Sequence, residues 1–170
     1  MSTLENMLKA PGAMLEVDDD PEEVHAFLCE RGLSDGLPVI PPTPERVERM
    51  LAYCDRDFDQ PVVKIPPRFG AATPIRIAAN AVMAGCKPEY FPLVLLALEA
   101  MAEEPYNLYG TQATTHPCTP FLIFNGPLAN EVGINAGQKN APICTSTWAA
   151  QTSATSFAGE RAMGATHWNR

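Results

Sequence analysis

One cysteine occupies a place in the sequence where a thiol can become reactive. Cys86 follows Ala84-Gly85 and precedes Lys87-Pro88, so it lies just beyond the expected end of one helix and before the start of the next. Backbone N–H groups at a helix N-terminus and an adjacent lysine favour the thiolate, which is the nucleophilic form. Cys86 is therefore a catalytic candidate for nucleophilic or redox chemistry. The alternative is a buried thiol in a tight turn between two helices.

An uncharged loop surrounds His116, the second catalytic candidate. Residues 105–130 include no Asp, Glu, Lys or Arg, and Thr114 and Thr115 directly precede the histidine. A histidine beside hydroxyl groups can transfer a proton or bind a polar small molecule. We expect Thr114, Thr115 and His116 to serve in binding more than in catalysis. The alternative is a loop histidine whose neighbours hydrogen-bond locally.

A basic interval precedes this loop. Residues 60–88 contain no acid, but they contain four cations: Lys64, Arg68, Arg76 and Lys87. Arg68 belongs to the stiff run P-P-R-F-G, and a guanidinium held on a stiff loop suits the binding of a carboxylate or phosphate. The alternative is that Arg68 pairs with the acidic first third of the chain.

Three further polar residues complete the candidate binding set. Asn125 stands at the end of an expected strand, Asn135 in the loop beyond it, and Asp35 in the run S-D-G-L-P. Strand ends and loops often line binding sites, although these residue types are also common in turns. We predict no metal site, because the five cysteines form no C-x-x-C pair. No phosphate-loop or dinucleotide glycine pattern occurs either, so the sequence names no cofactor.

The charge distribution excludes one class of protein. The chain of 170 residues carries a net charge of −8, and its first 60 residues alone carry −9. A general nucleic-acid binder needs a basic face, so nucleic acid is not an expected partner. No apolar run reaches the roughly 18–20 residues of a membrane span, and the N-terminus does not read as a secretory signal. We expect a cytoplasmic protein without a membrane partner.

Prolines mark the expected helix starts. Helices are predicted from Pro21, Pro44 and Pro74, because proline suits the first helical position. A fourth begins at Pro88 or at Phe91-Pro92, and its segment Leu93–Met101 should be the most buried element of the fold.

The elements together predict a mixed α/β class. Three to four helices with proline-led starts should pack on a small sheet that includes Val62–Ile65 and Phe121–Asn125. We expect one globular domain over residues 1–137 and a Ser/Thr-rich tail over residues 138–170.

Three stretches resemble a poorly characterised bacterial family. They are S-D-G-L-P-V-I-P-P-T-P-E-R-V, A-N-A-V-M-A-G-C-K-P-E-Y-F-P, and T-T-H-P-C-T-P-F-L-I-F-N-G-P-L-A with G-I-N-A-G, which together span about residues 33–137. Members of that family are often encoded beside, or grouped together with, (seleno)proteins that carry a U-G-S-C motif, which this chain does not contain. The resemblance implies small-molecule metabolism with a thiol- or selenol-based partner.

The resemblance assigns no role to any single residue. The following candidates lie in or near the matching strings: Asp35, Arg68, Cys86, His116, Asn125 and Asn135. Family members continue past the G-I-N-x-G string into further chain. We therefore expect residues from about 138 to be a truncated or frame-disturbed end, which would make the domain incomplete.

Two classes of function follow from these residues. The leading one is an enzyme or enzyme subunit acting on a small polar or anionic metabolite, with Cys86 as the thiol, His116 as the acid/base and Arg68 as the anion anchor. The rival is a non-catalytic substrate-binding or partner subunit, and an inactive truncated member is a third alternative. Expected partners are a small-molecule substrate, a UGSC-type (seleno)protein and further copies of the chain. Convergence of Cys86, His116 and Arg68 on one pocket favours the enzyme, and their separation favours binding.

Overall fold

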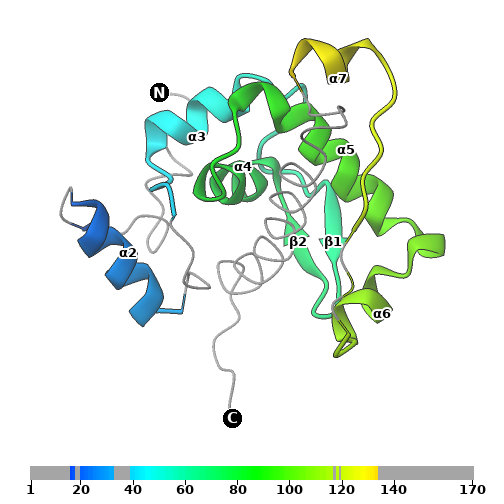
Figure 1. The fold of residues 1–170 in the computed structure, drawn as a ribbon, viewed down its shortest axis with the longest axis horizontal. Helices are drawn as coiled ribbons and strands as arrows, with labels where there is room; N and C mark the ends of the chain where they lie inside the picture. Colours follow the sequence, from blue (N-terminus) through cyan, green and yellow to red (C-terminus); the bar gives the residue numbers. More distant parts are fainter. Residues whose placement is uncertain (1–15, 18–19, 33–38, 117, 119, 134–170) are drawn as a thin grey trace, which may run out of the picture.

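Several helices and one short β-hairpin make up the regular structure in the part of the chain that the structure describes (Figure 1). This computed structural model describes residues 16–17, 20–32, 39–116, 118 and 120–133. The mixed α/β class with a small sheet, predicted from the sequence, is confirmed. The elements in chain order are α2 (Pro21–Glu30), α3 (Pro44–Leu51), β1 (Val63–Ile65), β2 (Gly70–Ala72), α4 (Pro74–Met83), η1 (Pro88–Tyr90), α5 (Phe91–Ala102), η2 (Glu104–Tyr106), α6 (Leu108–Ala113) and α7 (Pro127–Glu131).

Proline stands at the first position of α2, α3 and α4, as the sequence predicts. The missing proline N–H has no intrahelical partner there in any case, so the ring is tolerated. In α2 the Asp20 carboxylate also accepts hydrogen bonds from the backbone N–H groups of Glu22 and Glu23, at 2.9 and 3.0 Å. Pro88 opens η1 and Pro92 lies in the first turn of α5, so both predicted starts exist as successive elements.

The sheet consists of two antiparallel strands. β1 pairs with β2 so that Val63 lies opposite Ala72 and Ile65 opposite Gly70. The sequence predicted the first strand over Val62–Ile65, but it indicated only a loop and a helix start around β2. The second strand has the sequence G-A-A and no alternation of apolar and polar residues. It forms a strand because it pairs with β1.

The predicted strand Phe121–Asn125 is wrong. These residues belong to no strand, and the side chains of Phe121 and Ile123 are 74% and 79% exposed. Aromatic and β-branched residues form a strand only where a neighbouring strand completes the hydrogen-bond ladder. Neither strand of the hairpin takes Phe121–Asn125 as a neighbour.

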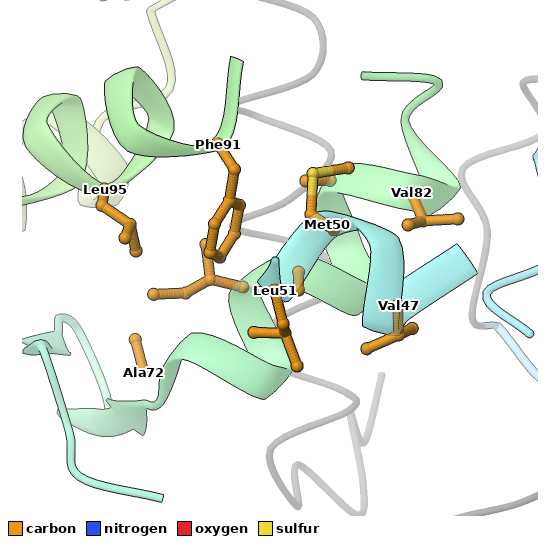
Figure 2. Packing of buried hydrophobic residues seen from close by; sticks show 10 residues of the cluster. Val47, Met50, Leu51, Ala72, Val82, Phe91 and Leu95 are labelled. Carbon is orange, nitrogen blue, oxygen red and sulfur yellow. The ribbon is translucent and has the colours of Figure 1, made fainter. Parts of the chain in front are cut away.

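The core lies where α3, α4, α5 and the hairpin meet. Figure 2 shows the side chains of Met50, Leu51, Phe91 and Leu95 pointing into this cluster. The prediction that Leu93–Met101 is the most buried element is wrong: α4 buries six of its ten residues, and α5 buries five of twelve. Small alanines in α4 let α3 and α5 both pack closely against it, so α4 becomes the central helix.

An ion pair joins the loop after α3 to α5. The Arg56 guanidinium donates hydrogen bonds to both carboxylate oxygens of Glu99, with Nη2 3.0 Å from Oε2. These hydrogen bonds lower the pKa of Glu99. The two side chains are 39% and 35% exposed, so solvent screens the pair and limits its contribution to stability.

We expect Glu99→Gln to lower the free energy of unfolding by about 0.5–1 kcal/mol at neutral pH. Because the pKa of Glu99 is lower in the folded chain, this contribution is complete above about pH 4.3. It is then lost as the pH falls through the folded pKa. Urea unfolding from pH 7 down to pH 3 measures it, and Glu48→Gln on α3 is the matched control. A difference from wild type that stays constant over this pH range contradicts the prediction.

Candidate functional site

The turn between β1 and β2 presents Arg68 and Phe69 at the end of the hairpin. Residues 66–69 form this turn, and the Pro66-Pro67 peptide bond is cis. Phe69 has a φ of 54°, a left-handed conformation that glycine adopts easily and that costs a residue with a side chain about 1–2 kcal/mol. Both Arg68 and Phe69 are exposed. The turn therefore holds a guanidinium and an aromatic ring next to each other at the surface.

Helix α6 lies beside this turn (Figure 1). The ring of Phe69 stacks on that of Tyr109 in α6, with centroids 6.4 Å apart and an interplanar angle of 22°. The helix starts at Asn107, which has a φ of 53° and whose side-chain oxygen accepts a hydrogen bond from the Gly110 N–H at 3.2 Å. A Cβ at Gly110 would lie 2.6 Å from the Asn107 side-chain nitrogen. Asn107 and Gly110 thus fit together and fix the start of α6.

Thr114, Thr115 and His116 follow the last residue of α6 and are exposed. The Thr114 hydroxyl accepts a hydrogen bond from the His116 N–H at 3.2 Å, and the Cys118 N–H donates one to the His116 carbonyl at 2.7 Å. These residues follow directly on α6, whose Tyr109 contacts Phe69 of the hairpin turn. We call Arg68, Phe69, Tyr109 and residues 114–116 the hairpin–α6 surface.

Two further cations adjoin the hairpin. Lys64 in β1 lies opposite Ala71, and the Arg76 Nη1 donates a hydrogen bond to the Ala71 carbonyl at 3.2 Å. Among the described residues, the ion pairs are those of Arg56, and none involves Lys64, Arg68 or Arg76. Pairing of Arg68 with the acidic first third, the alternative raised by the sequence, is not found within that part of the chain. The hairpin and its surroundings therefore carry positive charge that the described acids do not neutralise.

Cys86 closes the C-terminal end of α4. The Gly85 N–H bonds to the Val82 carbonyl and the Cys86 N–H to the Ala81 carbonyl, both at 2.9 Å, and Gly85 has a φ of 76°. This is a Schellman motif, in which a left-handed glycine lets the chain satisfy the last helical carbonyls. The Cys86 N–H is consequently engaged in ending α4, and the side chain packs against the hydrophobic core.

The expected lowering of the Cys86 pKa is wrong, because burial raises it to about 11. The carbonyl end of the α4 dipole faces this residue, and that end disfavours an anion. The Lys87 ammonium lies over the Tyr90 ring, 6.0 Å from its centroid.

The candidate catalytic residues do not converge. Cys86 precedes α5, and His116 follows α6. Helix α5 has 12 residues and is about 18 Å long. Figure 1 shows it running from the neighbourhood of α3 to α6. Cys86 and the hairpin–α6 surface thus lie toward opposite ends of α5.

Of the remaining predicted site residues, the structure describes Asn125, which is not part of the hairpin–α6 surface. Asn125 is exposed and precedes α7, which lies toward the end of α5 that is remote from α6 (Figure 1). Asp35 and Asn135 lie outside the described residues. The sequence did not indicate Phe69 and Tyr109 as site residues. Isolated aromatic residues in loops and short helices give no periodic signal, and the contact between these two joins distant parts of the sequence.

Two further properties of the described chain bear on its chemistry. Its His, Cys, Asp and Glu side chains do not gather in groups of three or more that could hold a metal ion. Within the same residues, no helix has the length and apolar character needed to cross a membrane.

Comparison with protein-family models, curated proteins and solved structures found no match to this chain.

Proposed function

We propose that this protein binds a small anionic metabolite at the hairpin–α6 surface, as a non-catalytic binding or partner subunit. One observation carries the proposal. Arg68 is exposed at the tip of a hairpin that also bears Lys64 and lies against Arg76, without an ion pair to any described acid. Such a guanidinium can bind a carboxylate or phosphate through two parallel hydrogen bonds.

The neutral groups that follow α6 suit the same ligand. Thr114, Thr115 and His116 offer hydroxyl and imidazole groups and carry no carboxylate that would compete for the guanidinium. The chain as a whole has a net charge of −8, which repels anions at long range. Salt screens that repulsion beyond about 8 Å, so local cations determine whether a small anion binds. We therefore expect the site to depend on Arg68 more than on overall charge.

Binding is favoured over catalysis because Cys86 and His116 are separated along α5. A thiol whose pKa is raised to about 11 is also a poor nucleophile at neutral pH. An enzyme that uses both residues together would need them within hydrogen-bond reach. In our proposal the chemistry is supplied by a partner protein, for which the sequence resemblance suggests a UGSC-type (seleno)protein. Co-purification of the two proteins tests that partnership.

We expect Arg68→Gln to weaken the binding of succinate or inorganic phosphate about 10-fold or more, because a charge-assisted hydrogen bond contributes about 1.5–3 kcal/mol. NMR titration of the full chain measures the dissociation constants. Arg49→Gln on α3 makes the same change of charge at an exposed position and should leave affinity nearly unchanged. Equal weakening in both variants, or no saturable binding by the wild type, overturns the proposal.

A further inference from the structure

We propose that the ligand of the hairpin–α6 surface is an aromatic carboxylate whose planar ring stacks on the Phe69–Tyr109 pair while its carboxylate meets Arg68. This inference rests on the proposed function and specifies its ligand class. It is carried by the aromatic pair, which the anion-binding argument does not use.

The aromatic pair is half open to solvent. Phe69 is 59% exposed and Tyr109 is 53% exposed, although their rings stack on each other. Each residue therefore keeps exposed surface on which a third ring can pack. Exposed aromatic side chains beside polar groups are typical of binding surfaces. The pair therefore offers an apolar, flat contact that a plain inorganic anion would leave unused.

The backbone at Phe69 points in the same direction. Its φ of 54° is one that glycine or asparagine adopts more easily, so a phenylalanine there is unfavourable for the turn itself. Burial does not compensate, because most of the side chain remains exposed. A ring held at such a position is explained if it contributes to binding, since strained residues concentrate at functional sites.

The neighbouring charge defines the other half of the ligand. Arg68 and Phe69 are consecutive, so their Cα atoms are about 3.8 Å apart. A ligand that carries an anionic group on an aromatic ring can therefore contact both residues. A carboxylate conjugated to an aromatic ring is planar, and the planar guanidinium matches it with two hydrogen bonds. An aromatic carboxylate satisfies both conditions in one molecule.

Matched probes separate the two halves of the proposal. We would titrate the full chain with 2-naphthoate, with decahydro-2-naphthoate, which keeps the carbon skeleton but is saturated, and with 2-naphthamide, which keeps the ring but has no charge. The wild type should bind 2-naphthoate about 3- to 10-fold more tightly than the saturated analogue, as expected for a stacking contribution. The amide should bind at least 10-fold more weakly than 2-naphthoate.

Variants then assign the contributions. Phe69→Leu or Tyr109→Leu should remove the preference for 2-naphthoate and leave the affinity for the saturated acid unchanged. Arg68→Gln should weaken both acids. Tyr53→Leu, at another exposed aromatic side chain, is the matched control and should change neither affinity. Thermal unfolding of each variant shows whether the fold is retained, and the agreement of two independent aromatic variants guards against a folding defect in one.

Each contrary outcome has a distinct meaning. If the two acids bind equally well and both need Arg68, the aromatic inference is overturned and the anion-binding proposal stands. If neither acid binds, both are overturned. If 2-naphthamide binds as tightly as 2-naphthoate, the surface is merely apolar, which also overturns the aromatic-carboxylate assignment. Tighter binding of adenosine monophosphate than of 2-naphthoate would likewise overturn the aromatic-carboxylate assignment, because it would identify the anionic group of the ligand as a phosphate.

Discussion

Phe91→Ala is expected to lower the free energy of unfolding by about 3–5 kcal/mol. Phe91 is the first residue of α5 and is 0% exposed. It belongs to the cluster in which α5 meets Met50 and Leu51 of α3, and Figure 2 shows its ring within that cluster. Truncation to alanine removes the transfer free energy of the ring and leaves a cavity that neighbouring helices can fill only partly.

Equilibrium unfolding in urea measures this loss for the full chain. Leu96→Ala in the same helix is the control, because Leu96 is 56% exposed and should cost less than about 1 kcal/mol. If Phe91→Ala does not fold, Phe91→Leu keeps most of the volume and should cost less than the alanine variant. Equal losses for Phe91→Ala and Leu96→Ala would show that the ring is not a central core residue.

Cys86 is expected to react with iodoacetamide about 250-fold more slowly at pH 8 than an ordinary exposed thiol. With a pKa of about 11, only about one molecule in a thousand carries the Cys86 thiolate at that pH. An unperturbed thiol has a pKa of about 8.5 and is roughly one quarter ionised. Because the thiolate is the reacting species, the rate should rise about tenfold for each pH unit up to pH 10.

Mass spectrometry of peptides after timed alkylation gives the rate at each cysteine. Exposed Cys118 provides a reference within the same molecule. The same reaction in concentrated urea should bring the rate at Cys86 close to that at Cys118, since unfolding removes the burial that raises the pKa. Rapid modification of Cys86 in the folded chain at neutral pH would show that Cys86 is a reactive nucleophile. That result would weaken the proposal of a non-catalytic binding subunit.

Local signals in the sequence predicted the helix starts well. Proline at a first helical position acts through its own fixed φ and missing N–H, so Pro21, Pro44 and Pro74 mark helix starts without help from the rest of the fold. The stop at Gly85 is local in the same way, because a glycine adopts the left-handed conformation that ends α4.

Elements that depend on a distant partner were not predictable. Residues 70–72 form β2 because β1 lies alongside them. Phe121–Asn125 stays outside the sheet because no described strand pairs with it. The prediction of a lowered pKa for Cys86 was wrong for a related reason. The sequence shows that a helix ends there, but burial against the core, which raises the pKa, comes from tertiary packing. The contact between Phe69 and Tyr109 likewise joins segments 40 positions apart.

The fit between Asn107 and Gly110 has an evolutionary consequence. Any side chain at position 110 would collide with the amide of Asn107, 2.6 Å from the added Cβ. A single substitution at position 110 therefore disturbs the start of α6 and, with it, the placement of Tyr109. The collision is relieved when residue 107 changes as well. Among descendants of this sequence, a substitution at position 110 should be accompanied by a shift of the Asn107 side chain or by a change of residue 107, so the two positions should tend to vary together.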